Sequence, residues 1–148
     1  MLTRLIYYSE NHAGGLSSRM VAALNDILDV SNRSNRRDDI TGALLFDTLW
    51  FIQILEGERA AVSATLRRIL ADPRHDGLTV MDARPIETRA FANWWMGLGM
   101  LRAENDALYA RHGLGPRFDP RTMTGEQAFG LALDLAKTGL QRNLAAAA

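Results

Sequence analysis

Phe51-Ile52-Gln53-Ile54-Leu55-Glu56-Gly57 is the stretch around which the chain is organised. Its seven residues are rich in apolar and β-branched types and end at a glycine, which is typical of a strand. Alternation along a strand places Phe51, Gln53 and Leu55 on one face, and Ile52 and Ile54 on the other. An amide therefore lies among apolar neighbours. A buried amide without partners costs about 1–3 kcal/mol, so Gln53 needs hydrogen bonds, to nearby backbone or to a functional group.

The composition excludes several classes of protein. The 148 residues favour one domain, and the 17 basic and 17 acidic residues cancel, which argues against a nucleic-acid partner. The absence of cysteine excludes disulfides, iron–sulfur clusters and thiol nucleophiles, and the three histidines are too far apart in sequence to suggest a metal site. No apolar run approaches 18 residues and Met1 leads directly into a strand pattern, so we expect a cytoplasmic protein without a membrane partner.

Hydrophobic periodicity predicts an α+β fold. Strands are expected at 3–9, 40–46, 50–57, 78–83 and from 91 or 93 to 100; helices are expected from Ser17 or Ser18 to about Ser31, and at 59–71, 103–112 and 125–140. The polar residues 32–39 are expected to form a loop. This order predicts a ferredoxin-like βαββαβ sheet with an extra fifth strand, two helices on one face and a C-terminal helical tail. The tail, or a second subunit, must cover the opposite face.

Several polar and aromatic residues are candidates for a site, although each has an ordinary structural explanation. Tyr7 lies in the middle of a strand, where a buried tyrosine usually belongs to the core. The other candidates are Asn35 with Ser31 and Ser34 at the expected end of the first helix, then Arg68, Asp72, Arg74 and His75 around the end of the second, and Trp94 and Met96 on the fifth strand. No metal-ligand spacing, phosphate loop or nucleophile–base set accompanies them.

Taken together, five motifs in order give a specific match over the first hundred residues. They are R-L-I-Y-x-S at 4–9, S-x-x-x-N followed by I-T-G within 31–42, F-x-Q-x-L-E-G at 51–57, D-x-R-H at 72–75 and R-x-F-x-x-W-x-M at 89–96. With these motifs the chain resembles the BLUF domain, the blue-light sensor that uses FAD. The resemblance implies a flavin-binding domain at residues 1–102 and a helical extension at 103–148 for capping or output.

The resemblance also implies a role for each candidate. Tyr7 would be the photoactive tyrosine, Gln53 the switching glutamine, and Trp94 and Met96 the pair that responds to light. The residues that would bind FAD, or FMN or riboflavin in its place, are Tyr7, Ile27, Ser31, Ser34, Asn35, Gln53, Arg68, Ile69, Asp72, Arg74, His75 and Met96. Among them, Ile27 and Ile69 would sandwich the ring, and Asn35 and Arg74 would contact its polar edge.

Two features depart from the family pattern. Ser34 stands where relatives often carry Asn or His, so one flavin contact is expected to be missing or bridged by water. The stretch 36–39 is more charged than usual. Tyr8 is the alternative to Tyr7 as the photoactive residue, although the motif spacing and the face shared with Ser9 favour Tyr7.

The resemblance implies a photoreceptor and not an enzyme. Light would drive electron and proton transfer from Tyr7, and an amide such as Gln53, with a donor end and an acceptor end, could then reverse its hydrogen bonds. The change would reach a homo-oligomer contact or a separate downstream protein. The rival hypotheses are an acylphosphatase-like enzyme on the same fold, which needs an arginine that 10–15 lack, and a regulatory module that binds another small ligand.

Overall fold

Five strands form one mixed sheet. The computed structural model describes residues 1–12, 18–73, 75–100, 106–115 and 118–138. The strands are β1 (Leu2–Asn11), β2 (Thr41–Phe46), β3 (Trp50–Glu58), β4 (His75–Pro85) and β5 (Gly97–Met100), in the spatial order β4-β1-β3-β2-β5. Only β2 and β5 pair in parallel; the other neighbours in the sheet are antiparallel. The βαββαβ order and the extra fifth strand are confirmed.

The register places one row of side chains across the middle of the sheet. Tyr7 on β1 is the direct partner of Gln53 on β3, Gln53 is the partner of Leu44 on β2, and Leu44 is the partner of Leu98 on β5. Directly opposed residues point to the same face and have Cβ atoms about 5 Å apart. The register therefore brings Tyr7 and Gln53, 46 positions apart in sequence, to the same point of the sheet.

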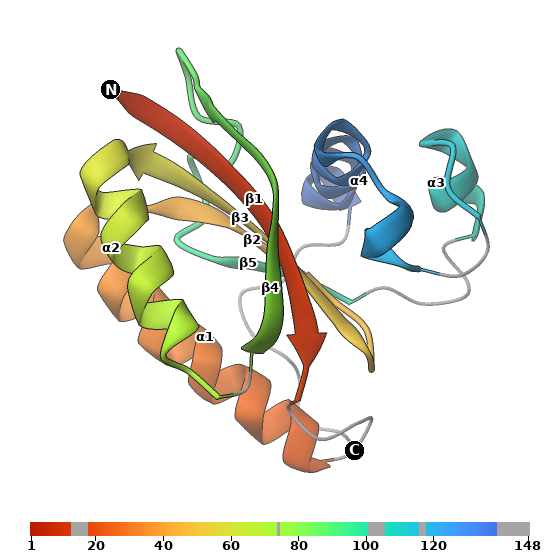
Figure 1. Ribbon diagram of the computed structural model, residues 1–148, viewed down its shortest axis with the longest axis horizontal. Coiled ribbons are helices and arrows are strands. Elements are labelled where there is room, and N and C mark those ends of the chain that lie inside the picture. The colour runs from red at the N-terminus through yellow and green to blue at the C-terminus, as the bar shows by residue number, and fades with distance from the viewer. Residues whose placement is uncertain (13–17, 74, 101–105, 116–117, 139–148) are drawn as a thin grey trace.

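Helices α1 (Ser18–Asp38) and α2 (Arg59–Leu70) lie together on one face of the sheet (Figure 1). The core on this side, called here the helix-side core, contains Leu24, Ile27 and Leu28 of α1 and Val62 of α2. The strands contribute Leu5, Tyr7, Leu44, Phe46, Phe51, Leu55 and Leu98 to it, joined by Ile40 and Met96. As the alternation of β3 predicts, Phe51 and Leu55 point to this side.

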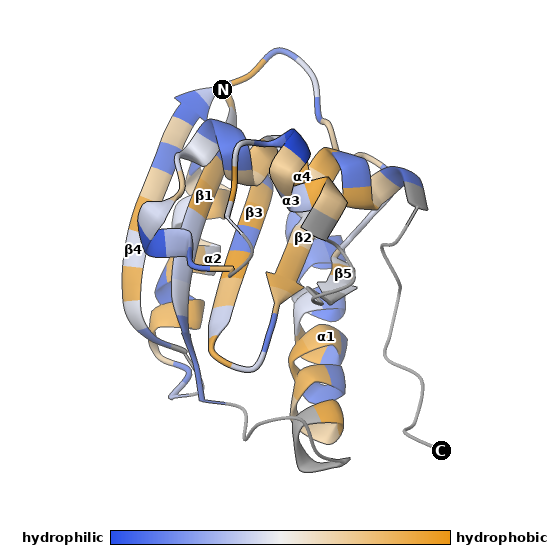
Figure 2. Ribbon diagram, turned by 90° about the vertical axis from the view of Figure 1, so that its right-hand side faces the viewer, coloured by the Kyte–Doolittle hydropathy of each residue, from blue (hydrophilic) through white to orange (hydrophobic). Residues whose placement is uncertain are grey.

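The C-terminal residues cover the other face. Helices α3 (Asp106–Arg111) and α4 (Gly125–Thr138), with the short 3-10 helix η2 (Pro120–Thr122) between them, lie across the sheet from α1 and α2 (Figure 1). A view from their side shows them in front of the mostly hydrophobic strands β2 and β3 (Figure 2). The tail-side core joins Ile6, Ile52 and Ile54 to Leu131 and Leu135, so the tail supplies the expected cover. Within the described residues, no helix combines the length and hydropathy needed to span a membrane.

The first helix is longer than the sequence analysis predicts. The polarity of 32–39 predicts a loop, but α1 continues to Asp38, and Asp39 ends it with a positive φ of 55°. The helical face explains the difference, since Asn35 follows Ile27 and Leu28 at helical spacing and is 1% exposed. Arg36 and Arg37 lie in the last turn, where cations interact favourably with the helix dipole. Asn35 is therefore a residue of the helix and not of a loop.

The fifth strand is shorter than predicted. It begins at Gly97, so Trp94 and Met96 precede it instead of lying on it. The chain turns first, because the amide of Trp94 donates to the carbonyl of Phe91 at 3.0 Å. Met96 and Leu98 still share the helix-side core, whereas Trp94 is only half-buried. The fourth strand is longer than predicted, starting at His75 and ending at Pro85.

Candidate functional site

A buried tyrosine, an amide and a thioether meet on the helix side of the sheet. The hydroxyl of Tyr7 donates to Oε1 of Gln53, and Nε2 of Gln53 lies 3.7 Å from Sδ of Met96. The three side chains are 0%, 3% and 2% exposed. Gln53 therefore uses its acceptor end toward the phenol and its donor end toward a sulfur, which is a weak acceptor. This set is the polar centre of an otherwise apolar core.

The phenol of Tyr7 is kept neutral by its surroundings. Burial raises the pKa of Tyr7 well above its ordinary value, because the phenolate would be desolvated there. The hydroxyl is consequently a donor at physiological pH. In this low-dielectric setting the hydrogen bond to Gln53 is stronger than it would be in water.

Asn35 connects α1 to the segment that carries Met96. Its Nδ2 donates to the carbonyl of Trp95 at 2.7 Å, and its backbone carbonyl accepts from the amide of Ile40 at 2.8 Å. Because this bond holds the carbonyl of Trp95, the residue directly before Met96, it constrains where the Met96 side chain can lie. Arg36, one position further along α1, has its guanidinium carbon 5.7 Å from the centre of the Trp95 ring.

Apolar side chains from both helices belong to the same core as Tyr7 and Met96. Ile27 of α1 belongs to the helix-side core, and Ile69 of α2 packs against it together with Leu66. Ser31 and Ser34 follow on α1 as half-buried residues. The structure thus brings Tyr7, Gln53, Met96, Ile27 and Ile69 into one core, with Asn35 joined to it through Trp95.

Arg68 binds residues of both helices in this structure. Its Nη2 donates to Oδ2 of Asp38 at 2.8 Å and to the hydroxyl of Thr65 at 3.1 Å, so it links α2 to the end of α1. The pKa of Asp38 is lowered to about 2, chiefly by its hydrogen bond with Arg37 and also by Arg68. Sequence reasoning missed Asp38 because it placed 32–39 in a loop. On a continued helix, Asp38 falls on the face of Ile27, Ser31 and Ser34.

The remaining candidates lie near the ends of α2 and β4. Asp72 is half-buried just after α2, and its amide donates to the carbonyl of Ile69 at 3.0 Å. His75 opens β4, paired with Asn11 in the register. Arg74 lies outside the described residues. The backbone carbonyl of Trp94 accepts a hydrogen bond from the amide of Gly42 at 3.0 Å.

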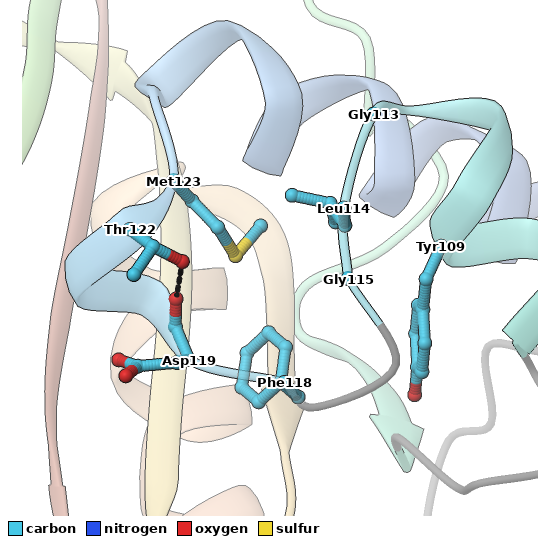
Figure 3. A pocket seen from close by; sticks show the side chains of 8 residues that line it. All are labelled: Tyr109, Gly113, Leu114, Gly115, Phe118, Asp119, Thr122 and Met123. Carbon is cyan, nitrogen blue, oxygen red and sulfur yellow. Dashed lines mark hydrogen bonds between the residues drawn. The ribbon is translucent and has the colours of Figure 1, made fainter.

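Two other features lie away from this centre. A cavity of about 260 Å³ in the C-terminal part is lined by Tyr109, Leu114, Phe118 and Met123, among others, and belongs to the tail side of the sheet (Figure 3). Glu10, His12 and Asp76 form an exposed group at the end of β1, where Nε2 of His12 lies 3.3 Å from Glu10 and 3.7 Å from Asp76. The pairing of an imidazole with two carboxylates accounts for this second group.

Comparison with known proteins agrees with the family motifs. The model of the BLUF family, described as sensors of blue-light using FAD, matches residues 2–97. The blue light- and temperature-regulated antirepressor BluF of Escherichia coli (strain K12) is 31% identical over 141 residues, which are 90% of this chain and 34% of that protein. The photoactivated adenylate cyclase subunit beta of Euglena gracilis is 36% identical over 94 residues, 64% of this chain and 10% of that protein. The chain therefore spans about a third and about a tenth of these two relatives.

Solved structures share the fold over nearly the whole chain. BlrB, a BLUF protein solved in its dark state, is 32% identical with a TM-score of 0.76, covering 93% of this chain and 96% of that one. The photo-activated state of BlsA has a TM-score of 0.84 over 95% of this chain and 99% of that one, at 23% identity. BlsA therefore supports the fold alone. These two likenesses reach beyond residue 97, into the C-terminal helices.

Proposed function

The chain belongs to the BLUF family, the sensors of blue light using FAD, and we propose that it is a blue-light photoreceptor in which Tyr7 and Gln53 perform the primary switch. The single observation that carries this proposal is the buried hydrogen bond from the Tyr7 hydroxyl to the Gln53 amide, with Met96 at the other end of that amide. A photoactive phenol and a reversible amide need this contact and need it shielded from water.

The residues present fit a flavin. Nε2 of Gln53 faces only a weak sulfur acceptor among its described contacts, so a ring carbonyl would be a better partner for it. Ile27 and Ile69 offer aliphatic surfaces from two helices, which suit the faces of a flat ring. Asn35, Ser31, Ser34, Arg68, Asp72, Arg74 and His75 would hold the polar edge and tail of the group, with FAD as the flavin of this family and FMN or riboflavin as substitutes.

Arg68 in this role would keep its bond to Asp38. That ion pair joins the ends of α1 and α2, the two helices between which the ring would lie. The pair therefore links the two helices and would contribute charge at the edge of the site. The charged stretch 36–39, a departure from the family pattern, gains a function in this arrangement.

The proposed switch uses the chemistry of the two side chains. A bound flavin would supply absorption of blue light and an excited state that accepts an electron. Tyr7 would give up an electron and its hydroxyl proton to the bound group, and Gln53, bonded to that hydroxyl, would relay the proton. When both are returned to Tyr7, the amide is left reversed, with its donor and acceptor ends exchanged. The amide nitrogen then no longer faces the thioether of Met96. The contact of Met96 with Gln53 therefore changes, and Trp94, two residues earlier in the chain, is affected through Met96.

The absorption spectrum before and after blue light tests this proposal. The purified protein should be yellow, with oxidised-flavin bands that shift slightly red on illumination and return in the dark. Gln53→Leu keeps the volume and apolar character but removes donor and acceptor, so this variant should fold, bind flavin and show no reversible shift. Tyr7→Phe should also lose the shift, because the ring remains and the hydroxyl is gone.

Tyr8→Phe is the matched control. Tyr8 points to the tail side of the sheet, where it packs edge-on against Trp50 with ring centres 5.9 Å apart. Its variant should keep the full reversible shift. A reversible shift in Gln53→Leu, or its loss in Tyr8→Phe alone, would contradict the assignment. A colourless protein would favour the regulatory module that binds another ligand.

The chain is proposed to signal through protein contacts and not through an enzymatic activity of its own. The match to a photoactivated adenylate cyclase covers a tenth of that protein, and the family match covers the sensor residues 2–97. Similarity to an antirepressor supports a separate downstream protein as the partner. Residues 1–102 would then sense light and residues 103–148 would transmit the change, in the cytoplasm. A homo-oligomer stays a second prediction, although α4 already covers the sheet face that suggested it.

A further inference from the structure

Glu56 is a buried carboxylate whose oxygens hold the chain on the way to Met96. Its side chain is 0% exposed. Oε1 accepts from the amide of Phe91 at 2.8 Å, and Oε2 accepts from the amide of Ala90 at 3.1 Å and from Nε and Nη2 of Arg4 at 3.0 and 2.9 Å. A buried charge is tolerated only when it is paired and hydrogen-bonded in this way. Glu56 therefore fixes the position of residues 90 and 91.

Further hydrogen bonds hold the chain before and after residues 90 and 91. Arg89 donates to the backbone carbonyl of Glu56 at 3.0 Å and to the hydroxyl of Thr41 at 3.1 Å, which fixes the start of the segment. The turn between Phe91 and Trp94, and the bond from Asn35 to the carbonyl of Trp95, fix its end. We call residues 89–96 the bridging segment. Every one of these contacts restricts where Met96 meets Gln53.

The bridging segment has one buried side chain in each core. Phe91 belongs to the tail-side core and Met96 to the helix-side core. Alternation along β3 matches this division, because Gln53 points to the helix side and Glu56, three positions later, points to the opposite side. A movement of Met96 would therefore reach Phe91, in the other core, through the four residues of chain between them.

Phe129 of α4 touches two of the residues that bind the Glu56 carboxylate, Phe91 and Arg4. Its ring lies edge-on to Phe91, with ring centres 6.2 Å apart and planes at 80°. The guanidinium carbon of Arg4 lies 3.9 Å from the centre of the same ring, a close cation–π contact. One aromatic side chain of the C-terminal extension thus contacts both the bridging segment and the cation that holds it.

We propose that Glu56 is the positioning residue that sets Met96 against Gln53, and that Phe129 is the residue through which α4 responds to movement of the bridging segment. This inference rests on the proposed function and deepens it by naming the route from the switch to the extension. When the Gln53 amide reverses, Met96 loses its partner and the bridging segment shifts. Phe91 and Arg4 then move relative to Phe129, and α4 loosens.

Hydrogen exchange of α4 in the dark and under blue light tests the route. Light should raise the exchange rate of amides within 125–138 by roughly three- to tenfold, the equivalent of losing one aromatic contact. Phe129→Leu keeps an apolar side chain but removes the ring that meets Phe91 and Arg4. This variant should keep the reversible red shift, because residue 129 lies on the other face of the sheet, while its light-induced change in exchange falls below roughly twofold.

Phe118→Leu is the matched control. Phe118 also packs on the tail-side core and lines the cavity of Figure 3, but it makes none of the described ring contacts of Phe129. Its variant should keep the full light-induced change. Equal behaviour of the two variants, or unchanged exchange of α4 in a wild type that shifts red, would overturn the route. A wild type without a red shift would instead refute the proposed function.

Glu56→Gln tests the positioning role. The neutral amide still fits but can no longer accept every bond from Arg4 and the two peptide amides, so the hold on the bridging segment weakens. The resting orientation of Gln53 then loses support from Met96, and dark recovery should slow by roughly threefold or more. A purely structural role would lower only the stability toward unfolding. Unaltered recovery in a folded, flavin-loaded Glu56→Gln protein would therefore refute the role, and Phe129→Leu tests the route even if Glu56→Gln does not fold.

Discussion

The hydroxyl of Tyr7 is fully buried, away from water, and still makes a directed hydrogen bond to Gln53. Burial raises its pKa, and the amide oxygen gives it an acceptor that holds the proton in a defined direction. A phenol in this state stays neutral in the dark over the physiological pH range. The starting point of the proposed switch is thus independent of ordinary changes in pH.

The raised pKa predicts how stability depends on pH. Because the folded protein holds this proton more tightly than the unfolded chain, whose tyrosine has a pKa near 10, the contribution is fully present below about pH 10. It is lost as the pH rises above that value, by up to about 1.4 kcal/mol per pH unit. Denaturant unfolding of the wild type and Tyr7→Phe at pH 9 to 11 measures the difference. Tyr7→Phe should lose this part of the slope and Tyr8→Phe should keep it; equal slopes in wild type and Tyr7→Phe would contradict the assignment.

For single residues, the sequence predicted positions better than hydrogen-bond partners. The alternation of β1 and β3 places Tyr7 and Gln53 correctly on one face, because a period of two is a geometric property of any strand. It could not predict that Nε2 of Gln53 meets Met96 or that Arg68 meets Asp38, since these contacts depend on the register and on the length of α1. The role of Glu56 was missed for a similar reason, as its partners lie 34 and 35 positions away.

Elements were predicted best where periodicity is strong and worst where polar residues continue a helix. α2 and α4 begin where their apolar stripes indicate, whereas α1 runs seven residues further, from 32 to 38. Polar residues there do not end the helix, because Asn35 among them is buried and donates to a carbonyl of the bridging segment. β5 is short because a turn at 91–94 comes first. Helix ends and edge strands are decided by such tertiary contacts, which a single sequence does not display.

Gly42 is predicted to be indispensable for the pairing of β2 with β3. A Cβ at this position would overlap the backbone carbonyl of Ile54, which cannot move because β3 lies in the middle of the sheet. Gly42→Ala should therefore lower the free energy of unfolding by about 3 kcal/mol. Gly115→Ala is the control, since nothing lies within 4 Å of its added carbon, and it should change stability by less than about 0.5 kcal/mol. Similar urea midpoints for both variants would refute the close approach.

The whole molecule is a sheet with two cores, and the two cores have different tasks. The helix-side core contains the buried phenol–amide pair, and the tail-side core contains apolar side chains of the sheet and of the C-terminal helices. The sequence predicted that the second face needs a cover but left open whether the tail or another subunit supplies it. The decision depends on how much apolar surface α4 presents, with Ala128, Leu131, Ala132 and Leu135 all buried. Oligomeric state in the dark and under light, measured by light scattering, remains the direct test for a homo-oligomer.

Leu131→Asp tests the cover itself. Leu131 is 0% exposed in the tail-side core, so the substitution removes an apolar side chain and buries a carboxylate without a designed partner. The loss should be about 3–5 kcal/mol, a large part of the roughly 5–15 kcal/mol that stabilises a typical domain. Detaching α4 would expose Ile52 and Ile54, and exposed apolar sheets of separate molecules associate with one another. The variant should therefore unfold at a lower urea concentration and form aggregates at micromolar protein concentration. Leu49→Asp, at a position 64% exposed, should do neither. A soluble Leu131→Asp protein with the wild-type midpoint would mean that α4 does not hold the sheet face, and the route through Phe129 would then lose its physical basis.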